Sequence, residues 1–183
     1  SADVSGTQVT VSDLNTYTGL LFNASFYYNG FIYAFKHTPN SNVLYQLLNN
    51  NTTKNITITG LPVSSWNNAA CTPTGIVYLL QNSTYKLFKI DLSTLAVTSV
   101  TLTGISDNAS NALWGDMVID PRTGDLLCWY HPTSGGSPKG LYKINLATNT
   151  LIHMGTNVQQ TMGTLFFETS GKSGILPDMT PPK

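Results

Sequence analysis

Apolar residues alternate with polar ones along most of the chain, in short stretches. Residues 8–14 (QVTVSDL) have the two-residue period of a strand with one buried face, and residues 20–28 (LLFNASFYY) form a longer apolar and aromatic stretch. Asn29-Gly30 separates the second stretch from FIYAF and is typical of a type I′ hairpin turn, because both residues tolerate positive φ. No stretch has sustained helical periodicity with caps, so the pattern predicts an all-β protein with almost no helix.

The same order of strands and turns recurs along the chain. Turn glycines recur at intervals of about 45 to 50 residues, at Gly30, Gly75, Gly124 and Gly174. A Leu-aromatic motif recurs in the third strand of each unit, as LYQL (44–47), LFKI (87–90) and LYKI (141–144). Such a period with four short strands per unit indicates β-propeller blades, here residues 20–61, 66–105 and 111–158. An all-β sandwich with regular hairpins is the alternative.

The third unit has the clearest turn, DPRTG over residues 120–124. Its proline presets φ and its glycine takes the positive φ that reverses the chain. The pattern D-P-x-T-G-x-L … L-Y-x-I-x-L-x-T resembles the blade repeat of the YVTN/NHL/quinoprotein-like β-propeller superfamily. The residues that carry the resemblance are Asp120, Pro121, Thr123, Gly124, Leu126, Leu141, Tyr142, Ile144, Leu146 and Thr148. The resemblance covers residues 8–176 and implies the architecture alone, because one fold hosts many functions.

Both ends of the chain are expected to contribute to one last blade. Residues 160–176 contain a first strand and the start of a second, and the prolines in the tail, residues 177–183, stop regular pairing. Residues 7–14 resemble the outer strands of the first two blades. We therefore predict one domain over residues 1–183, a propeller of about four blades with the last shared between the N- and C-termini. Its third strand is missing, so the blade has three strands, or the tail folds back, or another chain donates a strand by β-augmentation.

Composition narrows the classes of function. Charged residues make up 10% of the chain, and nine basic and nine acidic residues cancel. No basic patch is present to neutralise phosphates, and no apolar run approaches the roughly 20 residues of a spanning helix, so we expect neither a nucleic-acid partner nor membrane insertion. The chain starts at Ser1 without Met, which fits removal of a signal peptide. Together with hydroxyl-rich strands, these features predict a secreted or cell-surface protein.

Six Asn-x-Ser/Thr triplets support that location and predict glycosylation. They start at Asn23, Asn50, Asn51, Asn55, Asn82 and Asn108. Three of them cluster in a predicted loop and strand start, where a glycan can be accommodated. A chain rich in Asn and Thr also forms some triplets by chance.

Few residues are candidates for chemistry. His37 and His131 follow the second strand of the first and third blades, so they either share a ligand or metal site or are exposed loop residues. Asp116, Asp120 and Asp125 form the acidic cluster, which either binds Ca²⁺ or, in the case of Asp120, caps its own turn. No carboxylate or cysteine flanks the histidines at ligand spacing, and no triad spacing is present. We therefore predict no catalytic residue, metal or cofactor.

Four further residues have two interpretations each. Cys71 and Cys128 lie on adjacent blades, where they are either bridged or separate buried thiols. Trp66 and Trp114 each precede an inner strand and have Asn neighbours, so they either stack on a sugar or pack between blades.

These observations give three hypotheses for function. The first is a non-enzymatic structural module, secreted or on the cell surface, glycosylated and self-assembling into a filament or oligomer by strand exchange. Its partners are copies of itself. The second is a lectin-like propeller that binds carbohydrate or another ligand, and the third is a hydrolase or lyase on a propeller scaffold.

Overall fold

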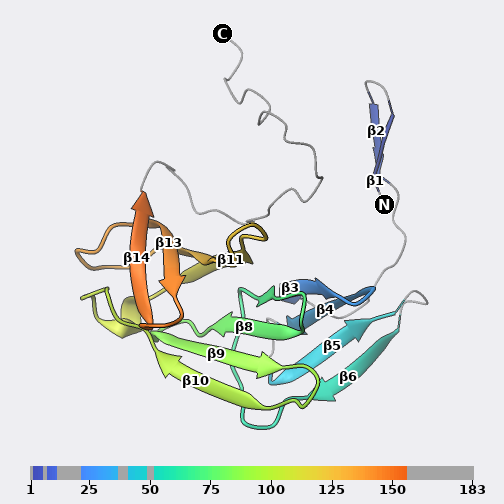
Figure 1. Cartoon of the computed structure of the whole chain (residues 1–183), viewed down its shortest axis with the longest axis horizontal. Helices are drawn as coiled ribbons and strands as arrows, with labels where there is room; N and C mark the ends of the chain where they lie inside the picture. Colours follow the sequence, from blue (N-terminus) through green and yellow to red (C-terminus); the bar gives the residue numbers. More distant parts are fainter. Residues whose placement is uncertain (1, 6–7, 12–21, 37–40, 49–51, 156–183) are drawn as a thin grey trace.

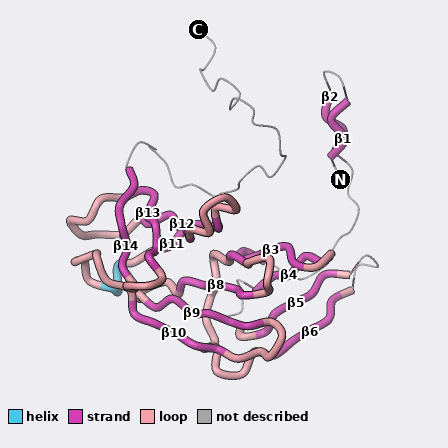
Figure 2. The backbone as a smooth tube through the Cα atoms, viewed as in Figure 1, coloured by secondary structure: helices cyan, strands magenta, loops and turns pink. Residues whose placement is uncertain are grey.

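The computed structural model describes short antiparallel strands and almost no helix (Figures 1 and 2). The described residues are 2–5, 8–11, 22–36, 41–48 and 52–155. Within them, the named strands form three four-stranded sheets and one two-stranded hairpin. The helical structure in these ranges is one 3₁₀ turn, η1 (Ala109–Asn111), and no described helix is long and apolar enough to cross a membrane. The all-β prediction is confirmed.

Each four-stranded sheet is a meander, in which strands consecutive in the chain are neighbours. The first sheet contains β3 (Phe22–Tyr28), β4 (Phe31–Lys36), β5 (Val43–Leu47) and β6 (Thr53–Thr57). The second sheet contains β7 (Ala70–Cys71), β8 (Ile76–Leu80), β9 (Lys86–Asp91) and β10 (Val97–Thr101). The third sheet contains β11 (Trp114–Ile119), β12 (Leu126–Tyr130), β13 (Gly140–Asn145) and β14 (Thr150–Gly155).

The first turn of each sheet has the predicted backbone. Asn29 and Gly30 have φ of 48° and 88°, and they join Tyr28 to its partner Phe31. Positive φ at both central residues is the type I′ requirement, so this hairpin prediction is confirmed. Gly75 and Gly124 have φ of 85° and 75° at the corresponding turns of the second and third sheets.

The turn at Asp120 is closed by its own first residue. The backbone carbonyl of Asp120 accepts a hydrogen bond from the N–H of Gly124 at 2.7 Å. The side-chain Oδ1 of Asp120 accepts another from the N–H of Arg122 at 2.9 Å. This Asx interaction confirms that Asp120 caps its own turn.

The second sheet lies between the first and the third, with a hydrophobic core on each side (Figure 1). The first core packs Phe35 and Leu44 of the first sheet against Val77 and Ile90 of the second. The second core packs Leu80 and Leu87 of the second sheet against the third sheet, from which come Trp114, Cys128, Tyr142 and Ile144. At the inner edge, β7 contacts both β3 and β11. The three sheets therefore follow one another in chain order.

One set of residues recurs with the same register in every sheet. We call it the aliphatic row: the residue two positions after the turn glycine, with its partners on the next two strands. The rows are Ile32–Leu47–Thr53, Val77–Ile90–Val97 and Leu126–Ile144–Leu151. In the second and third sheets the row packs into the core shared with the preceding sheet. In the first sheet Ile32 is 51% exposed.

The N-terminal segment forms a hairpin of its own. β1 (Ala2–Ser5) pairs antiparallel with β2 (Gln8–Val11). β2 lies inside the strand predicted over residues 7–14, whereas β1 was not predicted. The C-terminal part of the predicted last blade, residues 160–176, and the tail, residues 177–183, lie outside the described residues.

Candidate functional site

The three acids of the predicted cluster are each occupied locally. Asp120 forms an ion pair with Arg122, whose Nη2 lies 3.0 Å from Oδ2. Asp125 forms an ion pair with Lys143 on β13, with Nζ 2.7 Å from Oδ1. Asp116 accepts a hydrogen bond from the N–H of Met117 at 2.8 Å. No group of three His, Cys, Asp or Glu residues suited to a metal occurs among the described residues. The geometry favours turn capping over the Ca²⁺ hypothesis.

The two ion pairs keep the carboxyls of Asp120 and Asp125 ionised. The hydrogen bond from the Arg122 side chain, with the N–H of Arg122, lowers the pKa of Asp120 below its ordinary value. The Lys143 side chain similarly lowers the pKa of Asp125. A general acid at neutral pH needs a raised pKa instead. These two residues are therefore suited to holding the β-hairpin and not to donating a proton.

Of the two candidate histidines, His131 lies among the described residues. His131 is half-buried after β12, and its backbone N–H donates to the carbonyl of Leu113 at 3.0 Å. Partial burial, with the nearby charge of Lys139, lowers the pKa of His131, so its imidazole is neutral at physiological pH. His37 lies outside the described residues, and the shared-site hypothesis stays a prediction.

The two candidate tryptophans, which the sequence left open between ligand contact and packing, lie in the cores. Trp66 is 0% exposed and Trp114 is 2% exposed. Their indole N–H groups are also occupied: Trp66 donates to the carbonyl of Ser41 and Trp114 to that of Thr84, both at 2.9 Å. In both cases the accepting carbonyl belongs to the preceding sheet and lies two residues before the third strand of that sheet. The alternative interpretation, packing between sheets, describes both residues.

The two cysteines are free thiols in separate surroundings. Cys128 is fully buried in the second core, whereas Cys71 is half-buried beside the first. Burial raises the pKa of Cys71 to about 11 and also raises that of Cys128. A thiol with a raised pKa is a poor nucleophile, so neither residue has the environment of a catalytic cysteine.

The described glycosylation candidates differ in accessibility. Asn23, Asn55 and Asn108 are exposed. Asn82 is half-buried, and its Oδ1 accepts a hydrogen bond from the backbone N–H of Trp114 at 3.0 Å. The remaining candidates, Asn50 and Asn51, lie outside the described residues. Asn55 lies on β6, an edge strand, and Asn108 lies next to η1.

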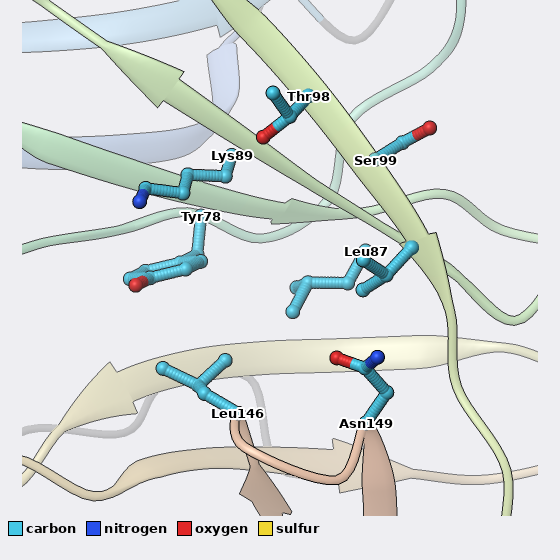
Figure 3. Close-up of a pocket in the computed structure, with 8 residues that line it drawn as sticks. Tyr78, Leu87, Lys89, Thr98, Ser99, Leu146 and Asn149 are labelled. Carbon is cyan, nitrogen blue, oxygen red and sulfur yellow. The ribbon is translucent and has the colours of Figure 1, made fainter.

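A groove of about 160 Å³ opens between the second and third sheets (Figure 3). One wall is formed by neighbouring residues on β8, β9 and β10, and the other by the turn that joins β13 to β14. The lining residues are Tyr78, Leu87, Lys89, Thr98, Ser99, Val100, Leu146 and Asn149. Tyr78, Lys89 and Thr98 are direct register partners, so they form one polar row across the sheet.

The groove can bind a small polar group. Lys89 supplies an exposed ammonium, Thr98 and Ser99 supply hydroxyls, and Asn149 supplies an amide. Among the described residues, no carboxylate lines the groove. Burial raises the pKa of Tyr78, which keeps its phenol a neutral hydrogen-bonding group. Because drug-sized ligands occupy about 300–1,000 Å³, the groove fits a fragment such as one sugar ring.

A polar cluster around Asp107 was not predicted from the sequence. Oδ1 of Asp107 accepts hydrogen bonds from the N–H groups of Gly136 (2.8 Å) and Ser137 (3.1 Å), and Oδ2 accepts one from the hydroxyl of Tyr130 (3.0 Å). The hydroxyl of Tyr85 donates to the Asp107 carbonyl at 3.0 Å. The cluster ties the connection between the second and third sheets to the loop after β12. With every oxygen of the carboxylate occupied, its role is structural.

Comparisons with known proteins identify an architecture and no family. No protein-family model matches the chain, and no curated protein matches it in sequence. Among solved structures, the crystal structure of Myxococcus xanthus glutaminyl cyclase matches 69% of this chain with a TM-score of 0.53 at 16% identity. The WD40 repeats of RRP9 match 74% of this chain with a TM-score of 0.49 at 13% identity.

The similarity shows the fold alone. This chain spans 57% of the glutaminyl cyclase chain and 38% of the RRP9 chain. The three four-stranded antiparallel sheets, together with the similarity to glutaminyl cyclase, identify a β-propeller-type, repeat-built fold. The prediction of a β-propeller-type fold is therefore confirmed, whereas the number of blades, the shared last blade and membership of the YVTN/NHL/quinoprotein-like superfamily stay predictions.

Proposed function

We propose that this protein is a non-enzymatic structural module, secreted or on the cell surface, that is glycosylated and assembles with copies of itself by strand exchange. Its fold is a propeller of about four blades, with the last blade shared between the two termini. The low charge of the chain supports a structural role at a surface, and the local pairing of Asp120 and Asp125 supports the absence of acid–base chemistry.

The observation that carries the proposal is the exposed aliphatic row of the first sheet. In the second and third sheets the equivalent residues Val77 and Leu126 are 0% and 1% exposed, because a preceding sheet covers them. Ile32 is 51% exposed, and its cross-strand neighbour Tyr27 on the same face is 70% exposed. Apolar surface that recurs at an inter-sheet interface gains stability when another sheet covers it.

The first test is the mass of the native particle, measured by light scattering on protein from its own source. The proposal predicts a large or polydisperse particle. Ile32→Asp places a charge on the row and is expected to reduce the particle mass. Val63→Asp is the matched control, because Val63 is 63% exposed in the connection that follows the first sheet. A wild-type protein that stays monomeric at high concentration would overturn self-assembly.

Glycosylation has a separate test. Intact mass spectrometry of the source protein, before and after enzymatic deglycosylation, is expected to show glycan mass that Asn55→Gln and Asn108→Gln each reduce. Asn82→Gln is expected to leave it unchanged, because Asn82 is half-buried and accepts the Trp114 N–H. A source protein with the bare polypeptide mass would contradict this part of the proposal.

A second candidate function is carbohydrate binding in the groove between the second and third sheets. The row of Tyr78, Lys89 and Thr98 beside apolar Leu146 supports it, since sugars offer both hydroxyls and an apolar face (Figure 3). Glycan-array binding that Lys89→Ala and Asn149→Ala abolish, and that Lys54→Ala on the first sheet leaves intact, would favour this function. An array without binding would remove it.

A further inference from the structure

The groove between the second and third sheets holds a lysine that forms no ion pair within the described part of the chain. Lys89 lies on β9 with its side chain exposed, and it belongs to neither of the two ion pairs found there. The hydrogen bonds from Ser93, ahead of the charge of Lys89, lower the pKa of Asp91, two residues along the strand. Asp91 is therefore held by its own turn, and the ammonium of Lys89 is accessible to an anionic ligand.

Two hydroxyl groups flank this ammonium in the sheet. Tyr78 on β8 and Thr98 on β10 are the direct partners of Lys89 on either side of β9. Directly opposed side chains have Cβ atoms about 4.5–5.5 Å apart, so both hydroxyls can hydrogen-bond to one group bound by Lys89. In Figure 3 the Lys89 ammonium and the Tyr78 hydroxyl extend toward the same end of the groove. Because charge-assisted hydrogen bonds are roughly twice as strong as neutral ones, this end of the groove favours an anion.

Beside the polar row, the groove has an apolar wall. Leu87 and Val100 are register partners on β9 and β10, and Leu146 lies across the groove from them, in the turn between β13 and β14 (Figure 3). Val100 is 37% exposed and Leu146 is 41% exposed, so both offer apolar surface to a ligand. A sugar ring has a face of C–H groups as well as hydroxyls, and it therefore fits an apolar wall next to polar groups.

Asn149 supplies an amide from the third sheet. Its φ of 55° places it in the turn between β13 and β14, and its carbonyl accepts hydrogen bonds from the N–H of Thr103 at 2.9 Å and from the hydroxyl of Thr103 at 3.3 Å. These contacts hold the backbone of the turn, and in Figure 3 the side-chain amide points from the turn toward Leu87. An amide both donates and accepts hydrogen bonds, so it can bind a sugar hydroxyl.

We propose that this groove binds an acidic sugar, a single ring that carries a carboxylate or a sulfate group. Lys89, with Tyr78 and Thr98, binds the anionic group. The apolar wall packs on the ring, and Asn149 binds one of its hydroxyls. Carboxylate and sulfate present the same chemistry to these donors, a negative charge on acceptor oxygens. Such binding rests on the second candidate function, carbohydrate binding, and narrows it to one class of sugar.

The test is a glycan array probed with the full chain, in which each acidic glycan has a neutral counterpart. The acidic glycans end in glucuronate, sialic acid or sulfated galactose, and each counterpart lacks only the carboxylate or sulfate. The acidic member of a pair should bind about tenfold more tightly, because a charged partner strengthens the hydrogen bonds at Lys89. Which acidic glycans bind distinguishes carboxylate from sulfate, and titration of the best one gives its affinity.

Lys89→Gln should lower the affinity for the acidic glycan about tenfold, to that of its neutral counterpart. Lys86→Gln is the matched control, because it removes the same charge from an exposed position on the same strand, and Lys86 is not among the residues that line the groove. Both lysines are exposed, so both variants should fold. Binding of the acidic glycan that Lys89→Gln leaves intact would overturn the assignment of the groove.

Salt dependence gives a second measurement, on the wild-type protein. Raising the ionic strength from about 0.1 M to about 1 M should weaken binding of the acidic glycan and leave its neutral counterpart unchanged, because salt screens an exposed charge. Equal affinity for acidic and neutral glycans would overturn the acidic class and leave carbohydrate binding standing. An array without any binding would overturn both. Acetate that binds as tightly as the acidic glycan would identify a site for anions alone and overturn recognition of the sugar.

Discussion

The first and third sheets have aliphatic residues at equivalent positions, but these residues are exposed or half-buried in the first sheet and buried in the third. Ile32 and Leu47 hold the positions that Leu126 and Ile144 hold in the third sheet. Leu126 and Ile144 are 1% and 2% exposed, whereas Ile32 is 51% exposed and Leu47 is half-buried. The difference lies in the neighbouring sheet: the second sheet covers the row of the third, whereas none of the described four-stranded sheets covers the row of the first. In this fold an aliphatic row is buried when a neighbouring sheet packs on it.

This comparison also explains why the end sheets are informative. Each sheet has one face for the preceding sheet and one for the following sheet, and the second sheet uses both. An uncovered face leaves apolar area in water at a cost of roughly 25 cal/mol per Å². The exposed row at one end and the unpaired indole N–H of Trp129 at the other are therefore the two places to test.

The largest loss of stability is expected when a buried residue of the third sheet's row is truncated. Leu126→Ala should lower the free energy of unfolding by about 2–5 kcal/mol, because it removes a packed side chain and leaves a cavity. Ile32→Ala should cost more than the roughly 0.5 kcal/mol typical of surface substitutions if a fourth sheet covers the row. Denaturant unfolding of both variants, with Val63→Ala as the exposed control, measures the difference.

The same unfolding experiment can contradict the proposed difference between the first and third sheets. Ile32→Ala that costs no more than Val63→Ala would mean that the first sheet keeps an open face in the isolated chain. Leu126→Ala with an equally small effect would contradict the second core itself.

A smaller difference in stability is expected between alanine substitutions at two turn glycines. Gly75 and Gly124 both have positive φ, where an L-residue costs about 1–2 kcal/mol. A Cβ on Gly124 would meet open space, whereas a Cβ on Gly75 would lie 2.7 Å from the hydroxyl of Tyr28 on the first sheet. Gly75→Ala should therefore lower the melting temperature more than Gly124→Ala. Equal shifts would show that Tyr28 moves aside without cost.

Local features of this fold were predictable from the sequence. Asn29-Gly30 and Asp120 with Gly124 determine their turns within a few residues, and the structure has the expected φ and Asx hydrogen bond. The period of the turn glycines reflects one repeated unit, which explains why the sheets could be expected. These signals need no information about distant parts of the chain.

Contacts between sheets were not predictable in the same way. The sequence left Trp66 and Trp114 open between ligand contact and core, because their burial depends on the sheet before each of them. The Asp107 cluster joins residues 22 to 30 positions apart, and its one local signal is the Gly-Gly-Ser run at 135–137, in which the backbone N–H groups of Gly136 and Ser137 bind the carboxylate. The partner of such a loop is determined by tertiary structure.

The smallest effect, and the sharpest in its pH dependence, is expected at Asp107. Partial burial acts to raise the pKa of its carboxyl, but the N–H groups of Ser137 and Gly136 and the hydroxyl of Tyr130 together lower it. A lowered folded-state pKa contributes stability above the unfolded value, about 3.9, and that stability is lost as pH falls through the folded value. Asp107→Asn should lower the melting temperature near neutral pH.

The difference between wild type and Asp107→Asn should shrink as pH falls below about 4, because the wild-type carboxyl then becomes protonated and neutral as well. Asp91→Asn is the matched control: the hydrogen bonds of Asp91 come from Ser93 in its own turn, so its loss loosens one hairpin end and no contact between sheets. Melting temperatures measured across this pH range decide the point. A constant difference at every pH would mean that Asp107 stabilises the loop by shape and not by charge, and the connection between the second and third sheets would then depend on packing alone.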